Sequence, residues 1–425
     1  MQCQGEEYTL LCARFAYLMK AFFLFARIAL RNVRRNTRRS LLTIFAIAFG
    51  LVCLIVFEAL KVGLHQEMIS STTGLDAASL QVHARGHELE PAVMNPVPRP
   101  EKVVSALKKA GAEDFSHRLK TPALLLAGQK SSAVLLSGVY PAEEARVTFI
   151  SRKVLRGSYL GGYKRILLGE ELARNLGVDV GDTATVTAQN RHGVPVTEKF
   201  AVGGIYRTEL AAFDSRHVYL SLQTAQEFLD AGEMVTEIAV RTKADSEKDL
   251  AASLRAALPE EGYQVKTWEE TIPDLKQLIG LNDATMNLLI LIVFAIIAMG
   301  IANTMTMVVF ERFRELGILA AIGTTPAGIL VMVVMESFFL GAIAALLGSV
   351  SGAGVCAYLA RYGIDLTQFT SANQYFANGH VLKAHLLAVD LVIANIVTVT
   401  TALVAGIYPA WKASRLKPVD AINHL

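Results

Sequence analysis

Cysteine is scarce in this chain: there are four among 425 residues, and none lies between residues 58 and 283. The chain also has no C-x-x-C pair and no cluster of cysteine with histidine. No disulfide can therefore hold residues 58–283 together, so that segment must be stabilised by its own hydrophobic core. The same scarcity gives no support for a structural zinc site.

The motifs of common catalytic sites are missing as well. The chain has no G-x-x-x-x-G-K-[ST] phosphate loop, no H-E-x-x-H motif and no G-x-S-x-G motif. His83 and His87 are close to Glu88, but they lie in a strand-to-loop stretch that does not favour a metal site. We therefore predict no catalytic residue, no metal site and no cofactor bound by this chain. Any energy that the protein uses must come from a partner or a gradient.

Charged residues are nearly absent from four long apolar runs. Residues 41–57 and 284–310 carry none, residues 327–360 carry only Glu336, and residues 386–411 carry only Asp390. Runs of about 20 such residues can cross a membrane as helices. The alternative is a large soluble protein with buried core helices, but core helices are rarely so long and so uniformly apolar. The overall composition, with 52% hydrophobic residues and a mean hydropathy of +0.39, also favours a membrane protein. The four runs predict that the chain crosses the membrane four times.

The basic residues are placed asymmetrically around these runs. Eight lysines and arginines and no acid lie between residues 14 and 39, and three more basic residues follow residue 411. By the positive-inside rule, both ends of the chain are cytoplasmic and residues 58–283 lie outside. Residues 22–33 fit an amphipathic helix in the membrane interface, and a basic flank without fixed structure is the alternative. Met19 offers an alternative start of translation.

The external segment alternates patterns of strand, such as residues 122–127, with patterns of helix, such as residues 170–176. This alternation indicates an α+β domain inserted between the first two membrane helices. Its middle, residues 121–205, is mostly strand and is predicted to be an inserted subdomain. Residues 275–282 lead into the second membrane helix without a strong break and predict a helical stalk. The predicted segments are a cytoplasmic basic part (1–40), transmembrane helix 1 (41–62), the external domain (63–275), the stalk with helix 2 (276–310), a cytoplasmic coupling segment (311–326), helix 3 (327–360), an external loop (361–385), helix 4 (386–411) and a cytoplasmic tail (412–425).

Three features of the predicted membrane helices are candidates for a role. Gly348 and Gly352 form a G-x-x-x-G pair, which permits close helix packing. Glu336 and Asp390 are acids within membrane helices, a position that is often functional. A hydrogen bond to a neighbouring helix or to the headgroup region is the simpler interpretation of both. The topology also puts them toward opposite sides of the membrane, which argues against a proton relay.

Three stretches together resemble the FtsX-like permease family of ABC transporters, which includes macrolide exporters and lipoprotein-releasing permeases. They are "FARIALRNVRRNTRRSLLTIFAIAFG", "NTMTMVVFERFRELGILAAIGTTPAGIL" and "AGIYPAWKASRLKPVDAINHL", which begin at residues 25, 303 and 405. The order of one span, a large external domain and three further spans is similar too. "HVYLSLQTAQEFLD" and "VTEIAVRTK" look like parts of the periplasmic core domain of that family.

The resemblance implies a dimeric permease of the bacterial inner membrane that works with separate cytoplasmic ATPase subunits, where ATP and Mg²⁺ would bind. It also implies that a helix after the second span couples to the ATPase. In this chain that role points to Glu311, Arg312, Arg314, Glu315 and Gly317, with Leu316, Ile318 and Leu319 available for the apolar centre of the contact. A turn that only sets topology is the alternative.

Partners expected from the resemblance are ABC ATPase subunits, a second permease copy or related chain, the lipid bilayer, and a periplasmic acceptor or adaptor, but no nucleic acid. Motion driven by the ATPase would act on a hydrophobic or lipid-linked substrate, such as a lipoprotein, through mechanotransmission. The alternative function is a non-transporting signal transducer that activates a periplasmic cell-wall hydrolase. A sensor or adaptor without an ATPase is a third interpretation.

Overall fold

The computed structural model describes residues 27–32, 34–35, 37–87, 95–208, 210–243, 246–365 and 381–415. Half of the predicted interfacial helix at residues 22–33 therefore lies outside the described residues, and residues 27–32 are helical. The chain divides into two compact units. The first, called the membrane unit, comprises Met1–Leu64, Leu281–Ile364 and Leu382–Leu425; the second, called the core domain, comprises His65–Gly280 and Asp365–Val381.

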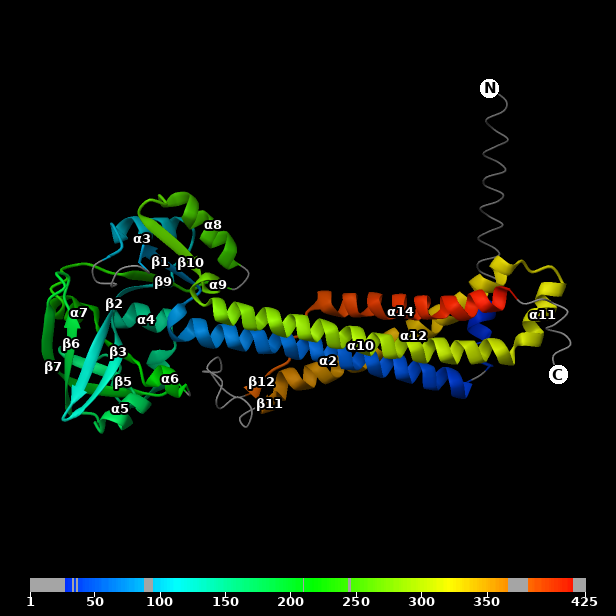
Figure 1. The fold of residues 1–425 in the computed structure, drawn as a ribbon, viewed down its shortest axis with the longest axis horizontal. Coiled ribbons are helices and arrows are strands. Elements are labelled where there is room, and N and C mark those ends of the chain that lie inside the picture. The colour runs from blue at the N-terminus through cyan, green and yellow to red at the C-terminus, as the bar shows by residue number, and fades with distance from the viewer. Residues whose placement is uncertain are drawn as a thin grey trace, which may run out of the picture. The chain divides into compact units, whose positions relative to one another are not determined.

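Within the described residues, four helices are long and apolar enough to cross a membrane. They are α2 (Thr37–Thr72), α10 (Pro273–Glu311), α12 (Pro326–Tyr362) and α14 (Ala388–Ser414), and Figure 1 shows them as long ribbons. α2, α10 and α12 each contain one of the four predicted apolar runs, whereas α14 begins at Ala388, two residues after the predicted start of the fourth run. Most extend past the predicted limits, because polar residues at a helix end can continue helical hydrogen bonding outside the apolar run. α10 begins at Pro273 and continues without interruption to Glu311, as the predicted stalk requires.

Small residues let the membrane helices pack closely. A Cβ added at Gly341 would lie 2.7 Å from the Ala402 Cβ, and one added at Gly406 would lie 2.2 Å from the Ser337 hydroxyl oxygen. α12 and α14 therefore approach more closely than larger side chains would allow. Asn395 on α14 and Ser349 on α12 add hydrogen bonds of 2.8 and 2.9 Å between the same two helices. A short β-ladder, β11 (Ile364–Asp365) with β12 (Val381–Leu382), lies between α12 and α14 in the sequence.

The core domain contains a sheet of ten strands among the described residues. The strands are β1 (Leu80–Ala84), β2 (Phe115–Ala127), β3 (Lys130–Val139), β4 (Val154–Gly157), β5 (Arg165–Gly169), β6 (Thr183–Gln189), β7 (Pro195–Tyr206), β8 (His217–Ser221), β9 (Glu237–Val240) and β10 (Tyr263–Thr267). The helices are α3 (Pro100–Lys109), α4 (Pro141–Val147), α5 (Glu170–Leu176), α6 (Ala211–Asp214), α7 (Leu222–Phe228), α8 (Glu247–Ala257) and α9 (Trp268–Thr271), with two single turns, η1 (Thr73–Ala77) and η3 (Ile150–Lys153).

The long strand β2 joins two parts of this sheet. Its first residues pair with β9, which continues through β1 to β10, while its later residues pair with β3 and β6. The pairings from β2 through β3, β8, β5, β7 and β6 return to β2, so these strands form a closed ring. The predicted subdomain at residues 121–205 lies mostly within this ring. Its limits differ from the structure, because it starts inside β2 and omits β8.

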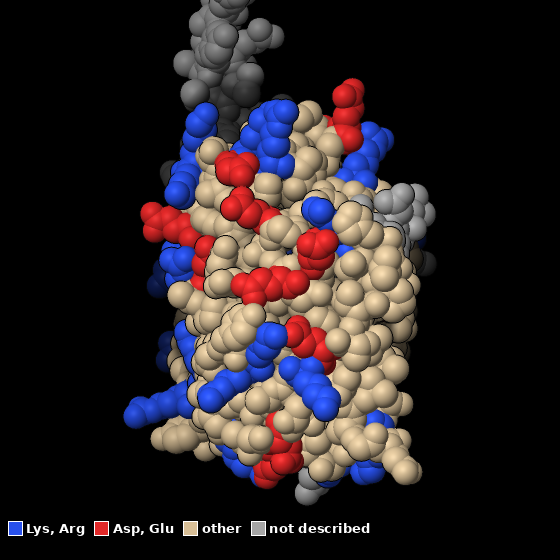
Figure 2. All heavy atoms as spheres, turned by 90° about the vertical axis from the view of Figure 1, so that its left-hand side faces the viewer, with Lys and Arg blue, Asp and Glu red and all other residues tan. Residues whose placement is uncertain are grey.

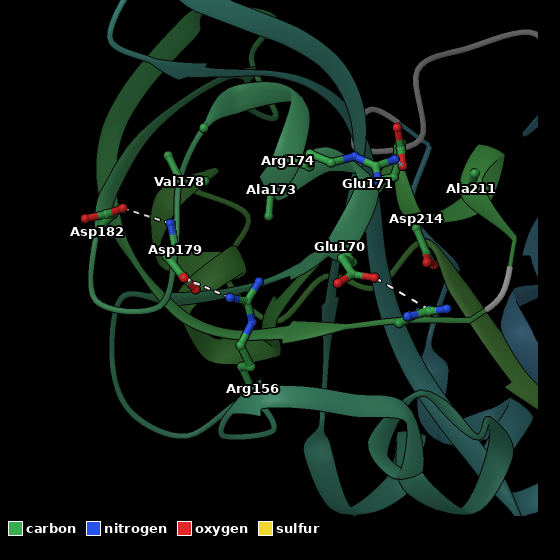
Figure 3. Close-up of a pocket in the computed structure, with 12 residues that line it drawn as sticks. Arg156, Glu170, Glu171, Ala173, Arg174, Val178, Asp179, Asp182, Ala211 and Asp214 are labelled. Atoms are coloured by element: carbon green, nitrogen blue, oxygen red, sulfur yellow. Dashed lines mark hydrogen bonds and ion pairs between the residues drawn. The ribbon is translucent and has the colours of Figure 1, made fainter.

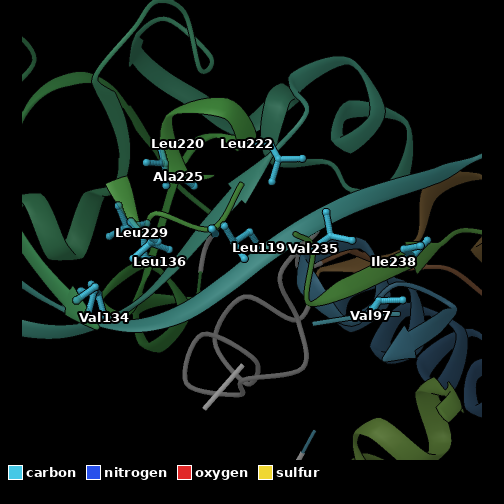
Figure 4. Packing of buried hydrophobic residues seen from close by; sticks show 14 of the residues in the cluster. Val97, Leu119, Val134, Leu136, Leu220, Leu222, Ala225, Leu229, Val235 and Ile238 are labelled. Atoms are coloured by element: carbon cyan, nitrogen blue, oxygen red, sulfur yellow. The ribbon is translucent and has the colours of Figure 1, made fainter. Parts of the chain in front are cut away.

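One hydrophobic cluster spans both parts of the sheet, so the two parts share a common core. Leu119, Leu136 and Leu220 come from the ring, and Val97, Val235 and Ile238 come from the region beside β9 (Figure 4). All of them are at most 4% exposed. Burial of such side chains stabilises the fold by roughly 1.5–3 kcal/mol each. On the surface turned toward the viewer in Figure 2, acidic and basic side chains are interspersed rather than gathered by sign.

Candidate functional site

The predicted coupling residues lie where α10 ends and a short helix begins. α10 ends at Glu311, Arg312 has non-helical backbone angles, and α11 (Phe313–Ala321) follows. The rings of Phe310 and Phe313 stack across the break with centroids 6.4 Å apart. α11 is therefore a separate helix whose direction is not set by α10 alone, as a coupling helix requires.

Arg312 is buried at this break. Its guanidinium group donates a 3.0 Å hydrogen bond to Glu336 on α12 and a 3.1 Å hydrogen bond to Glu315 on α11. Arg312 is 8% exposed and Glu336 is 6% exposed, so water screens this pair poorly. The intramembrane acid Glu336 thus has a cation from a neighbouring helix as its partner, and Arg312 is not available to a partner protein's surface.

The two glutamates of the coupling segment pair with the basic run at the start of the chain. Arg35 contacts Glu315 and Arg39 contacts Glu311, each over 2.5 Å between nitrogen and oxygen. Burial raises the pKa of Glu315, but hydrogen bonds from Arg35 and Arg312 outweigh it and hold the pKa below its usual value. We call the group of Arg35, Arg39, Glu311, Arg312, Glu315 and Glu336 the helix-end network. It joins the start of α2 to α10, α11 and α12.

The apolar face of α11 divides between burial and exposure. Leu316 is buried against Ile329 and Val333 of α12, so the expectation that it is available to a partner is wrong. Gly317 is also buried. Ile318 is 47% exposed and Ile322, just after the helix, is 75% exposed. Together with exposed Arg314, these two isoleucines form the surface that α11 leaves open.

The other predicted residues lie elsewhere in the membrane unit. Gly348 and Gly352 face α2: an added Cβ would lie 3.0 Å from the Ala48 carbonyl oxygen at Gly348 and 3.1 Å from Ile55 at Gly352. Asp390 is in the first turn of α14. Ser337, next to Glu336, contacts Gly406, which is 16 residues further along α14 than Asp390. At 1.5 Å per residue, Asp390 and Glu336 are about 24 Å apart along the helix and form no common site.

Arg35 and Arg39 are the functional candidates that sequence reasoning missed. In the sequence they are part of the positive flank that sets topology. Their spacing of four residues matches the spacing of Glu311 and Glu315, and this match is a signal in the sequence. The match alone does not identify the contact, because many other acids and bases share that spacing.

The core domain has a charged cavity of about 700 Å³ around α5 (Figure 3). Arg156 contacts Asp179 over 2.8 Å, and Arg207 contacts Glu170 over 3.6 Å. Asp214 accepts hydrogen bonds from the Thr208 backbone and hydroxyl. The charges of the cavity are thus paired within the chain, and the arrangement does not indicate a catalytic site. Within the described residues, no group of three or more His, Cys, Asp or Glu side chains is placed to hold a metal ion.

Comparison with known proteins identifies both units. Residues 40–257 match the model of the MacB-like periplasmic core domain, and residues 287–418 match that of the FtsX-like permease C-terminal region. The lipoprotein-releasing system transmembrane protein LolC of Xylella fastidiosa (strain Temecula1 / ATCC 700964) is 25% identical, over 93% of this chain and 98% of the relative.

Two further relatives are similar to this chain. LolC of Neisseria meningitidis is 22% identical over 71% of this chain and 76% of the relative. The macrolide export ATP-binding/permease protein MacB of Chlorobium luteolum is 23% identical, over 95% of this chain and 60% of the relative. The protein is thus a multi-pass membrane protein with a periplasmic domain, and as a permease of this type it is not itself an enzyme but works with an ATPase subunit. The chain belongs to the FtsX-like permease family of ABC transporters and carries a MacB-like periplasmic core domain.

Proposed function

We propose that this permease releases a lipid-linked substrate, a lipoprotein, from the outer leaflet of the bacterial inner membrane. The observation that carries the proposal is the match to LolC along 93% of this chain and 98% of the relative. ATP hydrolysis by separate cytoplasmic subunits, which bind ATP and Mg²⁺, would supply the energy. Mechanical transmission to the core domain would then move the substrate out of the bilayer.

The helix-end network supports α11 as the point where the ATPase acts. Arg312 and Glu315 tie α11 to α12 and to the start of α2, so a displacement of α11 moves charged groups on both helices. A helix held only by its loops would absorb such a displacement. On this proposal, Glu311, Arg312 and Glu315 transmit movement inside the permease, while Arg314, Ile318 and Ile322 contact the ATPase.

The remaining assignments follow from the same proposal. Both chain ends and α11 face the cytoplasm, because the basic residues gather at those ends of α2 and α14. A second copy of this chain, or a related permease, completes the transporter. A periplasmic acceptor or adaptor receives the substrate, since a lipid anchor does not remain dissolved in water without a partner.

The test is release from proteoliposomes that contain the permease with its ATPase. We expect ATP to drive the release of a lipid-anchored protein from the proteoliposomes to an added periplasmic acceptor fraction. A version of the same protein without its lipid anchor should not bind to the permease complex. Release should require hydrolysis, so a non-hydrolysable ATP analogue is the control. ATP hydrolysis at the normal rate without any release of lipoprotein would contradict the proposed function and would favour the signal-transducer alternative.

A further inference from the structure

The end of α2 passes into an unusual backbone segment. η1 is a π-helix, and the Ala78 amide closes it with a 3.0 Å hydrogen bond to the Thr73 carbonyl. Ala78 itself has φ of +54°, which residues with a side chain rarely adopt. Turns of this kind persist only where surrounding contacts hold them, and they are common at functional sites. The contacts that hold η1 therefore indicate what it does.

Two of these contacts use the backbone of η1. The Phe149 amide donates a 3.0 Å hydrogen bond to the Gly74 carbonyl, and a Cβ at Gly74 would lie 2.0 Å from the Phe149 ring. The Arg118 guanidinium donates a 2.5 Å hydrogen bond to the Asp76 carbonyl. These contacts place η1 directly against Phe149 and Arg118 of the core domain.

A buried ionic cluster lies beneath η1. Arg118 on β2 is 1% exposed and binds Glu144 of α4 through two hydrogen bonds of 2.7 and 2.9 Å. Both Arg118 and Lys120 contact Glu237 of β9, over 2.7 and 2.9 Å. Burial raises the pKa of Glu237, but Lys120 and Arg118 outweigh this effect and hold the pKa below its usual value. These four residues are two cations and two carboxylates, so their charges balance.

Asp76 adds a third carboxylate to this balanced group. Its side chain contacts Lys120 over 2.9 Å and Arg118 over 3.7 Å. The core domain does not need Asp76 to neutralise its buried charges, because Glu144 and Glu237 already do so. Of the five charged residues, only Asp76 is carried by the segment that continues α2.

We propose that Asp76 is a positioning residue that fastens the end of α2 to the sheet through Lys120 and Arg118, so that movement of α2 displaces β2 and β9. This inference rests on the proposed function, in which ATP hydrolysis moves the core domain. A cavity of about 380 Å³, lined by Thr72, Asp76, His217 and Asp274 among others, adjoins η1 and leaves room for such displacement.

The experiment uses the full permease with its ATPase in lipid nanodiscs and compares Asp76→Asn with Glu143→Gln. Glu143 is the matched control, because it is a carboxylate of the same region whose hydrogen bonds come from the backbone and ring of His117, the residue before Arg118. Hydrogen exchange of residues 115–120 and 237–240 is measured with ADP and with a trapped ATP state. ATP hydrolysis and thermal unfolding are measured on the same samples.

We expect Asp76→Asn to keep Tm within about 2 °C of the wild type, since the remaining four charges balance. ATP hydrolysis should continue, while the nucleotide-dependent change in exchange falls by about fivefold or more. Glu143→Gln should resemble the wild type in all three measurements. If Asp76→Asn showed the same nucleotide-dependent change in exchange as the wild type, the role of Asp76 would be overturned while the proposed function would stand. The same conclusion would hold if the change in exchange were lost only because Asp76→Asn had a lower Tm. A wild type without any nucleotide-dependent change would contradict the ATP-driven movement as well.

Discussion

Arg312 and Glu336 form a buried ion pair of 3.0 Å that connects the break between α10 and α11 to the interior of α12. Removal of one member of such a pair leaves a buried charge without its partner, which typically costs about 3–5 kcal/mol. We expect Glu336→Ala to lower the thermal stability of the purified permease by an amount in this range. Glu311→Ala is the control, since its pair with Arg39 is partly exposed and exposed pairs contribute about 0–1 kcal/mol. Equal losses in the two variants would refute the special importance of the buried pair.

The contact between Arg39 and Glu311 allows a charge-reversal test of the helix-end network. We expect Glu311→Arg to reduce ATP hydrolysis by the complex by about tenfold, because it places two arginines opposite each other. Adding Arg39→Glu should restore hydrolysis to within about twofold of the wild type. Steady-state hydrolysis in nanodiscs measures both effects. If Glu311 acted by binding the ATPase directly, the second substitution would bring no recovery.

The exposed surface of α11 predicts where the ATPase binds. We expect Ile318→Asp to weaken co-purification with the ATPase by about tenfold or more, because an interface core that loses an apolar contact and gains a charge loses affinity. Thermal unfolding of the permease alone should be unchanged, since Ile318 is 47% exposed. Arg361→Asp, at the opposite end of α12, is the control and should leave co-purification intact. Normal ATPase binding by Ile318→Asp would rule out this surface.

The glycines of α12 predict a difference between two faces of one helix. An added Cβ at Gly348 would lie 3.0 Å from both the Ala48 carbonyl oxygen and Leu51, whereas nothing lies within 4 Å at Gly354. We expect Gly348→Val to destabilise the membrane unit by about 1–3 kcal/mol through overpacking against α2. Gly354→Val should be nearly neutral in the same thermal unfolding assay in detergent. If both variants lost a similar amount of stability, the requirement for glycine at position 348 would come from backbone flexibility rather than from packing against α2.

Glu247 in the first turn of α8 predicts a pH dependence of the core domain. Burial raises the pKa of Glu247 to about 7. Between about pH 4.5 and 7, Glu247 therefore keeps its proton in the folded state but loses it in the unfolded state. The free energy of unfolding thus falls as the pH rises through this range. We expect Glu247→Gln to have little effect on Tm near pH 4.5 and to raise Tm relative to the wild type at pH 8. The exposed Glu113→Gln is the control, and a constant difference between Glu247→Gln and the wild type across pH would contradict the assignment.

Local patterns predicted much of the core domain. The helix at Glu170–Leu176 has the bounds that the sequence indicated, because acidic residues begin it and Gly177, in the left-handed conformation, ends it. The sequence pattern, in contrast, predicts a strand only from Pro122 onward, although β2 starts at Phe115. Its first half contains Arg118 and Lys120, which argue against a core strand until their partners are known. Those partners, Glu144 and Glu237, come from distant parts of the chain.

The same limit applies to the helix-end network. The sequence indicated a charged segment between two apolar runs, and its mixed signs suggested a polar surface. Burial of Arg312 follows from its position beside Glu336, 24 residues away, which helical periodicity does not reveal. Arg35 and Glu315 are 280 residues apart, so no local sequence pattern reveals their contact. The coupling role of these residues stays a prediction.

The matched spacing of the two outer ion pairs limits how α2 can slide. Arg35 and Arg39 are four residues apart, as are Glu311 and Glu315. The earlier arginine pairs with the later glutamate, so the two segments run in opposite directions. A shift of α2 by one helical turn, about 5.4 Å, would put Arg39 beside Glu315 and keep one pair, whereas a shift of half a turn would keep neither. A one-turn shift of α2 therefore preserves an outer ion pair that a half-turn shift loses, a difference of about 0–1 kcal/mol for pairs this exposed.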